Sequence, residues 1–356
     1  MQIKRLTKNC FVAPVSNARG AVAVMVAITM TVLLAMAAGA LDIGHALVAK
    51  NELQNAADAG ALAGTRRLSQ IYQGLAAQGM QTYTMSSSDL ADVVSVVQTT
   101  GLSNIAAGVS IVINAGDVQV GQWNPATRSL TPTTNLPRAV RVVARRDGRA
   151  NGPISTFLAK VIGITSVNVT AVATAAVSGI SSTNKGDLDA PFGISTYYFT
   201  QYGCGSTIKF YPNDGTPQAC AAWHAFDQAP ASANAIKNIV NGLRTGGYES
   251  PATAIGDSLQ FTNGNVATVF PNLLNLYNAK QVGGAWNVLV PVYESPSCTP
   301  PSGAITIRGY ATAKVTNVTT SPTNTITATV ACDIIDGDKS GGMDYGTFGV
   351  IPGLVE

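Results

Sequence analysis

GAVAVMVAITMTVLLAMAAGAL, residues Gly20 to Leu41, is the one long apolar run of the chain, and it holds no charged residue over 22 positions. A helix rises about 1.5 Å per residue, so this length matches the roughly 30 Å hydrocarbon core of a bilayer. A backbone in lipid must satisfy its own hydrogen bonds. The run therefore predicts a transmembrane helix, called the anchor below.

The charges on either side of the anchor predict its orientation. The residues before it carry only positive charge, on Lys4, Arg5, Lys8 and Arg19. Those after it carry both signs, on Asp42, Lys50 and Glu52. Since basic flanks stay in the cytoplasm, residues 1–19 are expected inside and the rest of the chain outside. A cleaved signal peptide is the rival interpretation, but its apolar core spans only about 7–15 residues, so an uncleaved anchor is favoured.

The composition of the 356 residues indicates a secreted, β-rich protein. Charged residues make up 12% and hydrophobic residues 46%, with a net charge of +3. The charged fraction is about half of the usual ~25%. A nucleic-acid binder is excluded, because the one basic stretch, RAVRVVARRDGR at 138–149, alternates like a half-exposed strand.

The cysteines agree with this topology. Cys10 precedes the anchor, and four cysteines follow it on the oxidising side: Cys204, Cys220, Cys298 and Cys332. Four cysteines allow three pairings, of which Cys204–Cys220 and Cys298–Cys332 are favoured. A zinc site is the alternative, but no pair has Cys-x2-Cys spacing and His224 is the only histidine nearby.

Periodicity and turn residues predict an α+β unit over residues 42–180. A helix is expected from 42 to about 85, with an apolar stripe at steps of three and four and small residues (AADAGALAG) in its middle. These small residues permit packing on the chain's own sheet or on a partner, and the sequence leaves both open. The segments that predict strands are VVSVVQ (93–98), VSIVINAG (109–116), a hairpin turning at Asn124-Pro125, AVRVVARR (139–146) and SVNVTAVATAAV (166–177).

A short helix is expected between these strands, and a second unit after them. Pro153 and Gly163 bound the helix ISTFLAKVIG. Polar, glycine-containing residues 179–190 predict a connection, with the linker proper at 181–190. Residues 191–356 predict a β-rich, disulfide-containing domain with one helix, ANAIKNIVNGL (233–243), among strands within 193–199, 206–212, 285–293, 304–315 and 324–332.

The residues after the anchor resemble a known family. Asp42, Gly44, Lys50, Leu53, Gln54, Ala56, Ala57, Asp58, Ala59, Ala61, Leu62 and Ala63 match the ordered pattern of TadE/TadG-like proteins of tight adherence (Flp) pilus assembly. Gly60 alone departs from the usual alanine. Residues 154–175 also resemble the family's later helix and strand, whereas the resemblance beyond residue 180 is only general.

The resemblance implies a role in pilus assembly and gives some residues a context. Pilins cut by a prepilin peptidase carry a glutamate five residues after the glycine at the cut, but here Met25 follows Gly20 at that distance. The chain therefore looks TadG-like, retained in the membrane. Asp42 is expected at headgroups or water where the helix leaves the bilayer. Gln54 and Asp58 form an i,i+4 pair on a polar face, and Asp58 is also placed to meet Arg66 or Arg67 of a neighbour.

Metal and catalytic sites have little support. Asp336, Asp338, Ser340 and Asp344 resemble the start of a calcium loop, but Thr347 stands where the bidentate glutamate belongs, so a polar turn is favoured. His45 lies at the membrane exit, and His224 has no identified nucleophile, since Cys220 is expected to be oxidised. No enzyme activity, cofactor or small-molecule substrate is expected.

The sequence thus predicts a single-pass protein of the bacterial inner membrane, with a cytoplasmic N-terminus and a periplasmic bulk. It would act in Flp pilus assembly through contacts with pilin or assembly proteins, while the sequence names neither partner nor stoichiometry. The alternatives are an adhesive or calcium-binding ectodomain and a processed minor pilin.

Overall fold

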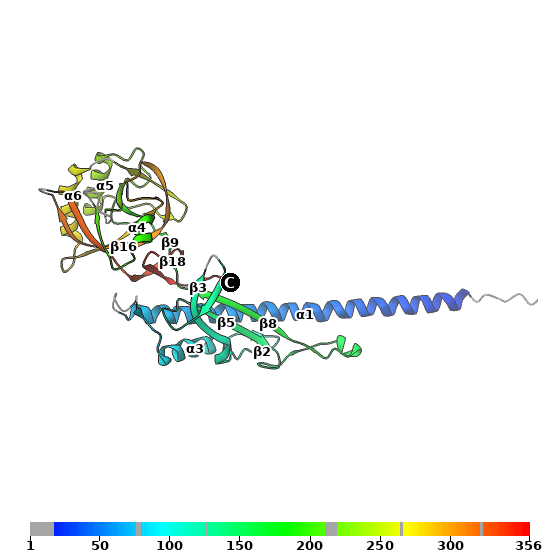
Figure 1. Cartoon of the computed structure of the whole chain (residues 1–356). Helices are drawn as coiled ribbons and strands as arrows, with labels where there is room; N and C mark the ends of the chain where they lie inside the picture. Colours follow the sequence, from blue (N-terminus) through cyan, green and yellow to red (C-terminus); the bar gives the residue numbers. More distant parts are fainter. Residues whose placement is uncertain are drawn as a thin grey trace, which may run out of the picture.

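The computed structural model describes residues 18–75, 80, 82–124, 127–210, 219–263, 266–320 and 323–356. For residues 18, 19, 21, 336–340 and 350 it describes the backbone alone. Cys10 and the basic residues Lys4, Arg5 and Lys8 lie outside the described residues. The architecture is α+β, as predicted: one long helix packs on a small sheet, and a β-rich unit with two disulfides follows (Figure 1).

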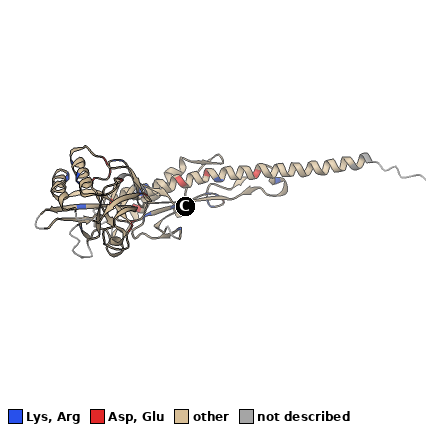
Figure 2. Cartoon of the chain, turned by 90° about the horizontal axis from the view of Figure 1, so that it is seen from above, with Lys and Arg blue, Asp and Glu red and all other residues tan. Residues whose placement is uncertain are grey.

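The anchor and the helix after it form one unbroken helix, α1 (Ala18–Gln73). Its first part is exposed over most of its length, with Met25 and Met36 each more than 60% accessible. It is the one helix among the described residues that is long and apolar enough to cross a membrane. Figure 2 shows the same part of α1 without charged residues. The helix ends at Gln73, earlier than the predicted limit at 85.

The second part of α1 is buried against a five-stranded antiparallel sheet and a second helix, α3 (Ser87–Leu102). In spatial order the strands are β20 (Gly353–Leu354), β8 (Val169–Ala176), β5 (Ala139–Arg146), β3 (Val118–Asn124) and β4 (Ser129–Pro132). Leu53, Ala57 and Leu68 are fully buried, which confirms the predicted apolar stripe.

The small residues of α1 serve packing within the chain. A side chain at Gly64 would place its Cβ 2.7 Å from a methyl carbon of Val97 in α3 and 3.1 Å from one of Val140 in β5. Both distances are below ordinary contact, so the glycine lets the helix, α3 and the sheet approach one another. Of the two interpretations that the sequence leaves open, the structure supports packing on the chain's own sheet.

Two local predictions for this unit are wrong. VVSVVQ lies inside α3 rather than in a strand: its valines at 93 and 97 face α1, and the Ser86 side chain accepts the Asp89 N–H at the helix start. Burial of a helical stripe outweighs the strand preference of β-branched residues here. ISTFLAKVIG forms only the two-residue β6 (Ile154–Ser155) and a short 3-10 helix, η2 (Ala159–Ile162).

Several strand predictions are confirmed. The hairpin pairs β3 with β4, and AVRVVARR and TAVATAA lie in β5 and β8, which pair along their whole lengths. VSIVINAG forms a strand only at β2 (Val109–Ser110), which pairs with β1 (Ile105–Ala106) and is followed by the 3-10 turn η1 (Ala115–Asp117). β7 (Ser166–Val167) pairs with β6.

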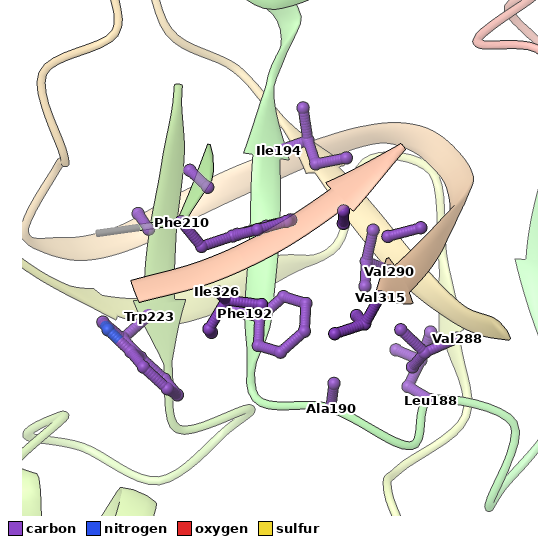
Figure 3. Packing of buried hydrophobic residues seen from close by; sticks show 14 of the residues in the cluster. Leu188, Ala190, Phe192, Ile194, Phe210, Trp223, Val288, Val290, Val315 and Ile326 are labelled. Carbon is purple, nitrogen blue, oxygen red and sulfur yellow. The ribbon is translucent and has the colours of Figure 1, made fainter. Parts of the chain in front are cut away.

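The second unit contains a seven-stranded sheet. In spatial order its strands are β11 (Thr207–Phe210), β17 (Thr325–Val330), β16 (Gly303–Thr319), β14 (Ser258–Thr262), β12 (Ala221–His224), β10 (Phe192–Ser195) and β15 (Trp286–Tyr293). Because the long β16 also pairs with β15, the strands from β16 to β15 close into a ring. Phe192, Trp223 and Val290 lie in its core (Figure 3).

Helices cover this sheet. The predicted helix over 233–243 is confirmed as α5 (Ala233–Thr245), and α6 (Phe270–Lys280), preceded by η3 (Ala267–Val269), was not predicted. The segment 193–199, predicted as a strand, divides between β10 and the short helix α4 (Thr196–Gln201). Leu273 and Leu276 of α6 are fully buried in the core of this unit.

A small sheet joins the two units. Its strands in spatial order are β13 (Thr253–Ala254), β9 (Gly179–Thr183), β18 (Asp333–Gly342) and β19 (Thr347–Ile351). β9 covers residues that the sequence assigns to a linker. After β19 the chain returns to the first sheet, where β20 pairs with β8. The predicted second unit, residues 191–356, therefore includes one strand, β20, that belongs to the sheet of the first unit.

The four cysteines after the anchor form two disulfides, as expected, but the favoured pairing is wrong. The bonds are Cys204–Cys332 and Cys220–Cys298. β11 pairs with β17, and the Gly205 N–H donates to Val330 O at 2.6 Å, so Cys204 meets the cysteine after β17. Sheet pairing, rather than proximity along the chain, selects the partner.

Candidate functional site

The residue that follows the anchor, Asp42, makes contacts within the chain. Asp42 is buried, and its carboxylate accepts the backbone N–H groups of Phe157 at 2.6 Å, Leu158 at 3.1 Å and Ala159 at 2.6 Å. These groups open the 3-10 turn η2, whose free N–H groups attract a negative charge. Asp42 therefore does not face headgroups or water as the sequence suggests.

The surroundings of Asp42 favour the ionised form of its carboxyl group. Burial acts to raise the pKa of the carboxyl, but the three backbone hydrogen bonds and the nearby His45 outweigh it, so the pKa lies below the ordinary 3.8. The ring of His45 also contacts that of Phe157, with centroids 5.1 Å apart. The two residues on one turn of α1 thus hold a loop 115 residues further along the chain.

That loop lies at the end of a long arm. Beyond β5 and β8 the hairpin continues through β6 and β7 and runs beside α1 toward the anchor (Figure 1). At its end Thr156 binds Ile164 O through its hydroxyl at 2.6 Å, and Gly163 adopts a positive φ of 93° that closes η2. We call residues Phe157 to Ile164 the tip.

A groove separates the arm from α1. Its volume is about 600 Å³, and it is open to one side. Gly39, Ile43 and Leu47 line it from α1, and Ile162 and Ile164 line it from the tip. The sequence did not identify this site, because the tip was predicted as an ordinary short helix.

Gln54 and Asp58 tie α1 to the sheet. The Gln54 Nε2 donates to Asp58 Oδ1 at 2.8 Å, as the i,i+4 spacing predicts, and also to Val172 O of β8 at 3.0 Å. Leu53 is fully buried, whereas a Cβ at Gly44 would meet nothing within 4 Å. Arg67, considered as a partner for Asp58 of a neighbour, pairs instead with Asp92 of α3 at 2.8 Å.

Three of the four calcium candidates, at 336, 338 and 340, lie on a strand, and Asp344 follows two residues after its end. The backbone of 336–340 belongs to β18, and the side chains of Asp336, Asp338 and Ser340 lie outside the described residues. Asp344 forms an ion pair with Arg138 and accepts the Gly346 N–H at 2.9 Å. An extended backbone rises about 3.3 Å per residue and so runs past a point instead of curling around it, which does not suit a loop that encircles an ion.

His224 is part of the core. It is fully buried against Phe226 and Phe261, and its Nδ1 accepts the Phe226 N–H at 3.3 Å. Burial lowers the pKa of its imidazole to about 3, so the ring is neutral. Cys220, four residues earlier, is in a disulfide and provides no thiolate.

Comparison with known proteins finds a family for the part of the chain that forms α1. Residues 20–78 match the family model of Flp pilus-assembly TadE/G-like proteins. No curated protein and no solved structure matches the chain. The matched residues run from the start of the anchor past the end of α1 and include Asp42, Gln54 and Asp58. The chain therefore carries a TadE/G-like Flp pilus-assembly domain at residues 20–78, within which lies an N-terminal apolar helix long enough to cross a membrane.

Proposed function

We propose that this chain is a single-pass component of Flp pilus assembly in the bacterial inner membrane, which acts through protein contacts in the periplasm. The observation that carries the proposal is the continuity of α1. Its exposed, charge-free part is long enough to cross a bilayer, and its next turns are the TadE/G-like residues that pack on the chain's own sheet.

The charges before the anchor and the disulfides after it support the proposed orientation of the chain in the membrane. The four basic residues before the anchor favour a cytoplasmic N-terminus. Both disulfides lie after the anchor, and disulfides persist in oxidising compartments such as the periplasm. The two observations are independent, and both support the proposed topology.

Sheet edges are the surfaces that we propose for partners. The second part of α1 is largely covered by its own sheet and α3, so little of it is free to bind. Among the described strands β4 pairs with β3 alone, and three of its four residues are exposed. An exposed edge presents unpaired N–H and C=O groups to which another strand can add.

The anchor is proposed to stay in the membrane, as in a TadG-like protein. Met25 supplies no carboxylate where processed pilins carry glutamate. Mass spectrometry of the mature protein tests this directly. An N-terminus at Met1 or Gln2 supports retention, and one at Ala21 would show that the chain is a processed minor pilin.

Deletion of the coding region in the host bacterium tests the function. We expect loss of surface pili and of adherence, restored by the full chain, with normal growth. Normal piliation in the deletion strain would refute the proposal. A photo-crosslinking residue at Thr131 of β4 should capture an assembly partner in native membranes, and Val282, 85% exposed in the second unit, is the matched control position.

A further inference from the structure

The tip carries a cluster of exposed apolar side chains. Val161 is 83% accessible and Ile162 78%, and Phe157, Leu158 and Ile164 are also exposed. Isolated exposed apolar residues are ordinary, but five of them within eight residues of one loop are a patch, which marks an interaction site in a folded protein.

The tip lies where α1 leaves the predicted membrane span. Asp42, the first residue after the anchor, holds the start of η2 through three backbone hydrogen bonds. Gly39, in the last turn of the anchor, lines the same groove as Ile162. The arm runs beside α1 toward the anchor, so the tip at its end lies beside the turns with which α1 leaves the predicted span (Figure 1).

The charge of the tip fits a lipid surface. Lys160 is the single charged residue between Phe157 and Ile164, and it is exposed. A lysine can direct its ammonium group to anionic headgroups while its stem and its apolar neighbours lie deeper. Apolar side chains flanked by a basic residue are typical of segments that bury about 5–10 Å into the interface.

We propose that the tip inserts into the periplasmic leaflet beside the anchor and gives the protein a second membrane contact. This inference rests on the proposed function only in that α1 spans the membrane. The occupant is lipid rather than a protein partner, because the patch is continuous with the anchor and lies at its membrane exit. Since Asp42 fixes the tip to α1, both contacts together set the tilt and rotation of the two units above the membrane.

Fluorescence of the full chain in vesicles tests the insertion. The label is an NBD group on Val161→Cys in a Cys10→Ser background, where the other four cysteines are in disulfides. The vesicles contain phosphatidylcholine and phosphatidylglycerol, with and without doxyl-labelled lipid. Val282→Cys, with an equally exposed side chain in the second unit, is the matched control.

We expect the label at 161 to emit at shorter wavelength than the label at 282 and to be quenched by doxyl lipid, while the label at 282 is not. Equal, unquenched emission at both positions would overturn the inference. A blue shift at 161 that occurs only when pilus proteins are added would also overturn it, because the tip would then bind protein instead of lipid. Flotation of the same samples separates the two proposals: protein that floats with the vesicles but has an aqueous tip refutes the insertion alone, and protein that fails to float refutes the anchor.

Discussion

The carboxylate of Asp42 lies 2.6 Å from the backbone nitrogen of Ala159, a residue 117 positions later in the chain. The contact joins the helix that carries the family's residues to the end of the arm. It explains physically why an acidic residue follows the anchor: the N–H groups at the start of η2 need an acceptor, and a carboxylate provides two oxygens for three donors.

Replacement of Asp42 by alanine should free the tip. The amides of Phe157, Leu158 and Ala159 then lose their acceptor, and we expect their hydrogen exchange to accelerate by about tenfold or more. Hydrogen exchange and mass spectrometry of the full chain in vesicles measure this. Asp92→Ala removes a carboxylate from a surface ion pair of α1 and α3 and should leave the tip unchanged. Equal protection of the tip in the wild type and Asp42→Ala would show that the contact is dispensable.

The same contact should resist mild acid. The pKa of Asp42 is lowered in the folded state, so its stabilisation is present above the ordinary value of 3.8 and is lost as the pH falls through the lowered pKa. The ratio of the exchange rates of these amides in Asp42→Ala and in the wild type should therefore stay constant from about pH 7 to about pH 5 and fall to one only below about 3.8. A ratio that already falls to one near pH 6 would contradict the lowered pKa of Asp42.

Local patterns predict the long helix well, because its evidence is local. The absence of charge in the anchor, the stripe through Leu53 and Leu68, and the Gln54–Asp58 spacing depend on residues within a few turns. α3 was missed although Ser86 and Asp89 have the spacing of a helix cap, because the valines that follow them, from Val93 to Val97, favour a strand.

Contacts between distant segments could not be predicted in the same way. The partner of Cys204 depends on the pairing of β11 with β17, and the acceptor role of Asp42 depends on where the arm ends. An apolar stretch such as FLAKVIGI looks the same in sequence whether it is buried or exposed. Only the fold shows that its side chains point outward beside the anchor.

Peptide mapping without reduction tests the disulfides. We expect linked peptides for Cys204–Cys332 and Cys220–Cys298 and none for Cys204–Cys220. Loss of either bond should reduce the free energy of unfolding by about 2–5 kcal/mol, because the unfolded chain regains conformational freedom. Cys204→Ser and Cys332→Ser should each match their double variant in thermal unfolding. A double variant much less stable than both single variants would show that the two cysteines act independently.

The close approach of α1, α3 and the sheet makes a prediction about two glycines of the same helix. At Gly64 a methyl group would lie 2.7 Å from a Val97 methyl, so Gly64→Ala must push α3 or β5 away and should cost about 1–3 kcal/mol. At Gly44 the same methyl meets nothing within 4 Å, so Gly44→Ala should be neutral or gain up to about 1 kcal/mol from helix propensity. Thermal unfolding of the full chain in detergent, followed by near-ultraviolet circular dichroism, compares the two variants. The packing requires a lower unfolding midpoint for Gly64→Ala alone. If this packing contributed nothing to the stability of the fold, both variants would unfold at the temperature of the wild type.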